Sequence, residues 1–167
     1  MKKPIFATII LLNIATIALA QTIKGTYAIK NVQTGMLLRV KDASGKNGTP
    51  LVAYYPENWK CMTWDFKNTG ENTYQLQNLF THKTFQPITA AAADVAFEEQ
   101  PLAGSTSNQQ YEFIAVKEDT YLIKLKGTDL YITPADKKGS VNSAIILAAK
   151  SDSPEQLWTI YQQSPTM

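Results

Sequence analysis

The residues that could carry catalytic or metal chemistry are few. Cys61 is the only cysteine and His82 the only histidine in the 167-residue chain. Zinc sites usually need several Cys or His ligands, and the sequence has no HExxH, CxxC or GxSxG motif. Cys61 is expected to be a small buried residue, the alternatives being a reactive thiol or an intermolecular bridge. We therefore predict neither a metal nor a cofactor.

Carboxylates are the remaining candidates for acid–base chemistry. Asp94, Glu98 and Glu99 lie close together in the sequence, and a glycosidase needs only two carboxyl groups. Solvated surface charge is the simpler explanation, because Asp and Glu are mostly exposed in folded proteins. The sequence therefore predicts a protein that is not an enzyme.

The first twenty residues have the pattern of an export signal. Lys2 and Lys3 precede an apolar run over 5–17, and an A-x-A cleavage site follows at 18–20. We predict a signal peptide over 1–20 that is cleaved after Ala20. The protein is then secreted or periplasmic.

The predicted mature chain, 21–167, is long enough for one domain with its own core. The full chain has 16 Lys and Arg against 14 Asp and Glu, so loss of Lys2 and Lys3 leaves a net charge of zero. Nucleic-acid binding requires a basic surface. No apolar stretch of the mature chain approaches the roughly 20 residues of a membrane span. We predict neither a nucleic-acid partner nor a membrane span.

The sequence repeats with a period of 47 residues. Thr-Tyr at 26–27 recurs at 73–74 and at 120–121. Five further columns keep this spacing: Ile29, Leu76 and Ile123; Thr34, Thr81 and Thr128; Leu38, Phe85 and Ile132; Trp64, Tyr111 and Trp158; Phe66, Phe113 and Ile160. Such regular self-similarity indicates three copies of one structural unit, over about 24–70, 71–117 and 118–164.

Each repeat has four short segments typical of β-strands. Tyr27 and Ile29 alternate with Ala28 and Lys30, the period of a half-buried strand. Twelve strands in three repeats favour a closed barrel with pseudo-threefold symmetry, because closure leaves no exposed strand edge. The predicted fold is therefore all-β, a β-trefoil. The expected strands are 25–32, 36–40, 51–55 and 62–67 in the first repeat, 73–79, 83–87, 95–99 and 111–116 in the second, and 120–125, 130–134, 144–149 and 157–162 in the third.

A recognisable motif opens the fourth strand of each repeat. Residues 156–158 are a complete Q-x-W, residues 109–111 keep the Gln, and residues 62–64 keep the Trp. With G-T-Y-x-I-x-N at 25–31 and N-G-T-P at 47–50, the chain resembles the ricin-type β-trefoil lectin domain, in its single-domain, disulfide-free form. The resemblance implies that the tryptophan of the motif is a core residue and that the glutamine supports a hairpin.

The resemblance also implies where a sugar would bind. In this family an Asp on the second strand, an aromatic residue ending the third, and an Asn or Gln before the fourth bind galactose-type sugars. No repeat keeps all three residue types, so the sites are degenerate copies. The corresponding residues are Arg39, Tyr54 and Cys61 in the first repeat, Gln86, Pro101 and Asn108 in the second, and Thr133, Ala148 and Glu155 in the third.

The first repeat is the best remaining candidate for carbohydrate binding. Tyr54, Tyr55 and Trp59 supply rigid aromatic area with a polar edge, and Arg39 and Asn58 supply hydrogen-bonding groups. Trp59 has no aromatic counterpart in the other repeats, so it is either a plate for a sugar or a cap on the open end of the barrel. We predict a lectin-like protein whose partner is a glycan or glycoconjugate.

The second repeat offers a secondary candidate site, Glu99, Asn108 and Gln109, which has polar groups but no aromatic plate. The alternative function is a β-trefoil protease inhibitor or protein-interaction module that acts through a projecting loop. The loops at 56–60 and 101–108 are the candidates for that role.

Overall fold

The structure is a computed structural model that describes residues 22–104 and 106–167, and it has twelve β-strands there. The predicted signal peptide lies outside the described residues. Six strands pair antiparallel in a closed ring, each with the next and the last with the first. They are β1 (Thr26–Asn31), β4 (Thr63–Gly70), β5 (Thr73–Asn78), β8 (Tyr111–Lys117), β9 (Thr120–Leu125) and β12 (Leu157–Gln162). The predicted closed barrel is confirmed.

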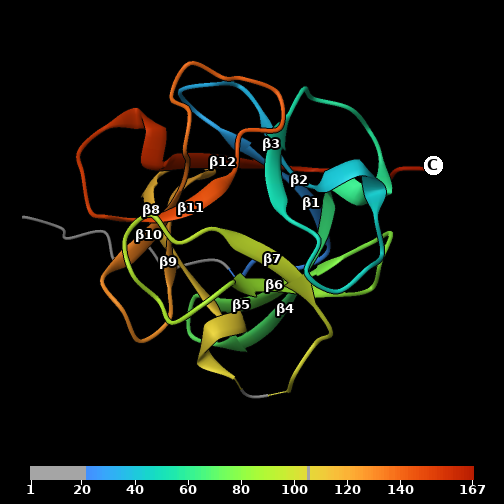
Figure 1. Ribbon diagram of the computed structural model, residues 1–167, viewed down its shortest axis with the longest axis horizontal. Helices are drawn as coiled ribbons and strands as arrows, with labels where there is room; N and C mark the ends of the chain where they lie inside the picture. The colour runs from blue at the N-terminus through green and yellow to red at the C-terminus, as the bar shows by residue number, and fades with distance from the viewer. Residues whose placement is uncertain (1–21, 105) are drawn as a thin grey trace, which may run out of the picture.

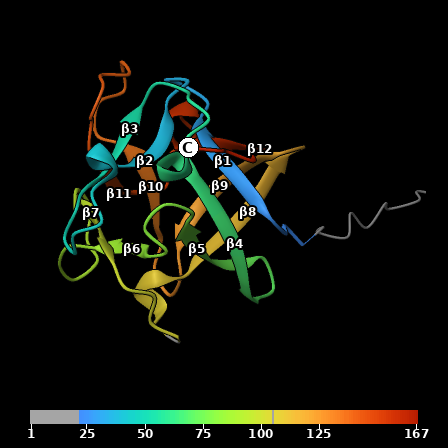
Figure 2. The same cartoon turned by 90° about the vertical axis from the view of Figure 1, so that its right-hand side faces the viewer.

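The other six strands form three hairpins at one end of this barrel. Single β-bridges join the hairpins pairwise, between Pro50 and Glu98, Val52 and Ala144, and Ala96 and Ile146. Figure 1 shows β3, β7 and β11 around the centre of the molecule, and the side view in Figure 2 separates them from the long barrel strands. The hairpins are β2 (Leu37–Val40) with β3 (Leu51–Tyr54), β6 (Thr84–Pro87) with β7 (Phe97–Gln100), and β10 (Leu130–Pro134) with β11 (Ile145–Ala149).

Short 3-10 helices complete the repeats. Three of them directly precede the fourth strand of a repeat, and one follows β2. They are η1 (Lys41–Ala43), η2 (Lys60–Met62), η3 (Ser107–Gln109) and η4 (Pro154–Gln156). Within the described residues, no helix is long and apolar enough to cross a membrane.

The predicted strands agree with the observed ones except at their ends. β4 continues to Gly70, because its last residues pair with β5 in a hairpin that contains a bulge between Asn68 and Gly70. β7 begins at Phe97 rather than at Val95, because the Val95 N–H closes a turn with Ala92 O at 3.3 Å.

The aromatic column at the fourth strands forms the centre of the core. All three rings are fully buried, and each donates a hydrogen bond to a main-chain carbonyl on the second strand of its own repeat. These bonds join Trp64 Nε1 to Leu38 O (3.2 Å), Tyr111 Oη to Phe85 O (2.8 Å) and Trp158 Nε1 to Ile132 O (3.0 Å). The threefold sequence repeat is therefore also a repeat of contacts.

The glutamines of the Q-x-W motif support the loop after the third strand, as the resemblance implies. Gln109 accepts from Ala103 N (2.8 Å) and donates to Pro101 O (3.1 Å). Gln156 in the same way joins the ends of its own loop. In the first repeat Met62 takes this position and is buried in an apolar cluster. The loop after β3 therefore needs another support.

Candidate functional site

Gln163, from beyond the end of β12, supports the loop between β3 and η2. Its Nε2 donates to Glu57 O (3.0 Å), and its Oε1 accepts from Thr63 Oγ1 (2.8 Å). Farther along the loop, the Lys60 N–H donates to a main-chain oxygen of Met167 (2.7 Å). The sequence of the first repeat does not indicate that Gln163 supports this loop. It indicates only that the loop needs another support, because Met62 stands where the other repeats have Gln.

A Gln163→Ala substitution is expected to lower the free energy of unfolding by about 1–2 kcal/mol, because it removes the two hydrogen bonds that this buried side chain makes to Glu57 and Thr63. Gln163 is 7% exposed. Urea denaturation measures the loss, and hydrogen exchange at Lys60 should report a looser loop. Gln162→Ala, at an exposed neighbour, is the matched control and should change stability by less than about 0.5 kcal/mol. Equal stability of the two variants would contradict the assigned role.

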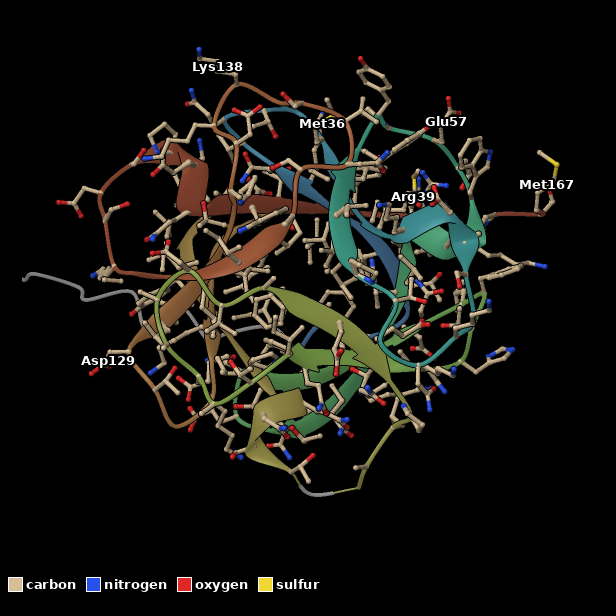
Figure 3. All side chains as sticks on the ribbon, in the orientation of Figure 1. Met36, Arg39, Glu57, Asp129, Lys138 and Met167 are labelled. Carbon is tan, nitrogen blue, oxygen red and sulfur yellow. The ribbon has the colours of Figure 1, made fainter. Side chains whose placement is uncertain are left out.

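An open pocket of about 390 Å³ lies beside this loop, and its lining is mainly apolar. Two of the predicted site residues, Arg39 and Trp59, line it, and Cys61 at the family's third position does so as well. Arg39, Glu57 and Met167 lie on the same side of the molecule (Figure 3). The described lining residues are Arg39, Ala43, Trp59, Lys60, Cys61, Phe80 and Met167.

Arg39 and the aromatic residues of the first repeat lie together. Tyr54 lies against the guanidinium of Arg39, whose Cζ is 4.0 Å from the centre of the Tyr54 ring and 5.8 Å from that of Trp59. The Tyr54 ring centre is 6.2 Å from that of Trp59 and 5.9 Å from that of Tyr55. Tyr55 and Asn58 are exposed and lie outside the pocket lining.

Trp59 both packs against the protein interior and lines the pocket. It is half-buried, and part of its ring packs against the apolar cluster of Ala28, Leu37, Cys61 and Met62. Another part lines the pocket. Cys61 itself is 4% exposed, which confirms the prediction of a buried thiol.

Two positively charged side chains, Arg39 and Lys60, are among the described lining residues of the pocket. Arg39 is 8% exposed, and its Nε is buried with no hydrogen-bond partner in the described part of the chain. Lys60 is the other charged residue of the lining, and no Asp or Glu belongs to it. The ion pairs found among residues 22–104 and 106–167 involve Lys67, Lys124 and Lys137, not Arg39.

The secondary candidate in the second repeat is divided between structural contacts. The amide of Gln109 holds the loop after β7, and Asn108 is exposed. Glu99 points elsewhere: its Oε1 accepts a hydrogen bond from the Thr81 hydroxyl. These three side chains do not converge on a described pocket.

Glu99 also corrects the expectation of a solvated charge. Asp94 is exposed and Glu98 is half-buried, but Glu99 is completely buried. Burial raises the pKa of the Glu99 carboxyl above its ordinary value of 4.5, against the hydrogen bond from Thr81 and the charge of Lys83, which lower it. The reason for the burial is the alternation along β7, which points Phe97 and Glu99 to the same inner face.

The third repeat uses its family positions for internal contacts. Thr133 Oγ1 donates to Glu155 O (3.1 Å), and the Glu155 carboxylate forms an ion pair with Lys137 (2.6 Å). Across the described ranges there is no group of three or more His, Cys, Asp and Glu residues that could hold a metal ion.

The family comparison agrees with this architecture. A family model described as a ricin-type beta-trefoil lectin domain-like family matches residues 16–95. The chain is a β-trefoil that resembles ricin-type lectin domains. No curated protein matches this β-trefoil in sequence.

Several solved structures share the trefoil fold. The designed threefold-symmetric protein ThreeFoil has a TM-score of 0.78, is 17% identical, and the match covers 83% of this chain and 99% of that one. The Rhizoctonia solani agglutinin has a TM-score of 0.76 at 18% identity, over 87% and 100% of the two chains. The Macrolepiota procera ricin B-like lectin, solved with lactose, has a TM-score of 0.71 at 17% identity, over 84% and 97%. At such identities the likeness is one of fold.

Proposed function

We propose that the protein is an exported, non-catalytic carbohydrate-binding protein of the lectin type, with its working site in the first repeat. The observation that carries the proposal is the pocket in which Trp59 lies beside the guanidinium of Arg39. A sugar presents apolar C–H faces and a polar rim, so its site needs an aromatic surface next to hydrogen-bond donors. The trefoil neighbour from Macrolepiota procera, a lectin solved with lactose, supports this class of ligand.

The other two repeats support a single working site. In the second, Gln86 Oε1 accepts from Gln109 Nε2 (2.9 Å), so the side chain at the family's Asp position is engaged internally. In the third, the Thr133 hydroxyl donates a hydrogen bond to the main-chain oxygen of Glu155, and the Glu155 carboxylate pairs with Lys137. Neither repeat has an aromatic residue at the platform position, where Pro101 and Ala148 stand.

Export through a cleaved signal peptide is part of this proposal and is supported by the basic start, the apolar run and the A-x-A site of residues 1–20. Expression with the full leader, followed by mass spectrometry of the periplasmic and culture fractions, tests it. We expect a mature chain that begins at Gln21 in one of these fractions. An unprocessed chain that stays in the cytoplasm would contradict export.

Trp59→Ala is expected to weaken glycan binding about 30-fold or more, because a buried aromatic anchor contributes about 2 kcal/mol or more to binding. Isothermal titration calorimetry with a glycan panel measures binding by the wild-type protein and the variant, and tryptophan fluorescence follows binding by the wild type. Trp64 and Trp158 are fully buried in the core, so a ligand-dependent change reports mainly on Trp59.

The matched control for Trp59→Ala is Tyr161→Ala, a partly exposed aromatic residue on β12 outside the pocket, which should leave binding unchanged. Because Trp59 is only half-buried, its removal should cost about 1–2 kcal/mol of stability. A much larger loss of stability would mean that Trp59 acts as a cap. The absence of a fluorescence change with every glycan class would refute the proposal.

Protein binding through the projecting loop is the second candidate function. It is favoured by the hydrogen bonds of Gln163 to Glu57 and of Met167 to Lys60, which hold the loop at its middle and at its C-terminal end while the side chains of 55–58 stay exposed. A screen against serine and cysteine proteases separates it from carbohydrate binding. Inhibition that is lost in Asn58→Ala, in a protein that binds no glycan, would favour this second function.

A further inference from the structure

Arg39 is a buried charge without a counterion among the described residues. The residue is 8% exposed, its Nε has no hydrogen-bond partner, and no described ion pair includes it. A guanidinium has five N–H donors and stays charged at every pH at which proteins fold. Buried charges are ordinarily paired, because removal from water costs free energy that only a partner offsets.

The contact with Tyr54 offsets this cost only in part. The guanidinium carbon lies 4.0 Å from the ring centre, which is the geometry of a cation–π interaction. That interaction engages a face of the guanidinium and leaves its edge of N–H groups free. Tyr54 thus positions Arg39 in the pocket wall without supplying a hydrogen-bond acceptor.

The described lining of the pocket contains no Asp or Glu side chain either. The other charged residue in its lining is Lys60, and the remaining lining residues are Ala43, Trp59, Cys61, Phe80 and Met167. A pocket that combines a positive group with apolar walls fits a ligand that has an anionic group and an apolar face. The planar fork of an arginine matches a carboxylate or a sulfate particularly well.

We infer that the glycan bound in the first repeat is acidic, with a carboxylate or sulfate that pairs with Arg39 while its sugar ring lies against Trp59. This inference rests on the proposed carbohydrate-binding function and specifies its ligand class. Arg39 stands where the resembling family has an Asp that accepts hydrogen bonds from sugar hydroxyls. An arginine at this position can only donate hydrogen bonds. The site should therefore prefer a ligand with an anionic acceptor to one that offers only hydroxyl donors.

The test compares acidic and neutral forms of the same sugar by isothermal titration calorimetry on the wild-type protein. The pairs are digalacturonic acid with its methyl ester and 6′-sialyllactose with its methyl ester, for the carboxylate, and 6-sulfated galactose with galactose, for the sulfate. We expect the acidic member of at least one pair to bind ten times more tightly or better, and the advantage to shrink as the salt concentration rises.

Two substitutions at Arg39 assign the effect. Arg39→Met keeps the apolar stem and removes the charge, so the acidic and neutral forms should then bind equally, with a melting temperature equal to the wild type or higher. Arg39→Lys keeps the charge but loses the planar arrangement of N–H donors, so it should retain part of the preference for the acidic sugar. Lys60→Met tests the other positive side chain of the same lining, and it should lower the preference less than Arg39→Met does.

The outcomes separate the two proposals. Equal binding of acidic and neutral sugars by the wild-type protein overturns the acidic ligand class and leaves carbohydrate binding intact. A preference that is lost in Lys60→Met and kept in Arg39→Met also overturns the assignment to Arg39. No binding of any member of the three pairs, together with no response to a wider glycan panel, overturns carbohydrate binding itself.

Discussion

Replacing Trp158 with alanine is expected to lower the free energy of unfolding by about 3–5 kcal/mol, the range for large aromatic residues removed from a core. The side chain is completely buried, and its Nε1 donates to Ile132 O at 3.0 Å. The substitution leaves a cavity at the centre of the trefoil and a buried carbonyl without its donor. Since small domains are stable by only about 5–15 kcal/mol, this single change removes a large part of the total.

Urea denaturation of the Trp158→Ala and Trp59→Ala variants measures how much each tryptophan contributes to the free energy of unfolding. Because Trp59 is half-buried, the Trp59→Ala variant should lose only about 1–2 kcal/mol of unfolding free energy. Tyr111→Phe removes only the hydroxyl that donates to Phe85 O (2.8 Å) and should cost about 1–2 kcal/mol as well. A loss below about 2 kcal/mol for Trp158→Ala would contradict a tightly packed pseudo-threefold core.

Replacing Glu99 with glutamine is expected to stabilise the protein at neutral pH by about 1–2 kcal/mol, because it removes a buried carboxylate with an unpaired oxygen. Burial raises the pKa of Glu99 in the folded protein above its ordinary value of 4.5. The folded state therefore holds this proton more tightly than the unfolded state does. Wild-type stability must then fall as the pH rises from about 4.5 through the raised pKa.

Thermal unfolding between pH 4 and pH 8 tests this sign. Glu99→Gln keeps an oxygen that can accept the Thr81 hydrogen bond, and the part of the pH dependence due to Glu99 should disappear. Its advantage over the wild type should be largest at the high end of the range and smallest at pH 4. Glu98→Gln, at the half-buried neighbour, is the control. If the wild-type protein instead becomes more stable as Glu99 ionises, the charge of Lys83 outweighs the effect of burial on this carboxyl group.

The architecture of this trefoil could be predicted because the same residue pattern occurs three times, each time within a short stretch of the chain. Each repeat has its own strand alternation, its own turn residues and its own aromatic residue in the Q-x-W column, so errors in one copy are corrected by the others. Where the prediction missed, at the ends of β4 and β7, the cause was a hairpin contact or a turn rather than the residue pattern.

The sequence contains a pattern that predicts the burial of Glu99, but the charge of the two adjacent glutamates favoured the opposite conclusion. Two adjacent glutamates suggest solvated charge, yet the alternation that begins at Phe97 places every second residue of β7 on the inner face. The strand period therefore decided the burial of Glu99, and its carboxyl obtained one partner, Thr81, from a segment 18 residues away.

The sequence by itself determined the repeat, the barrel strands, the buried aromatic column and the singular character of the first repeat with Arg39, Tyr54 and Trp59. These properties follow from local periodicity and from spacing. Only the tertiary structure decided that Gln163 supports the loop of the first repeat, 106 residues away in sequence. Only the tertiary structure decided that Phe80 and Met167 line a pocket together with Arg39, which has no counterion among the described residues. Contacts of this kind join segments of different repeats, and closure of the barrel, which no single repeat specifies, brings them together.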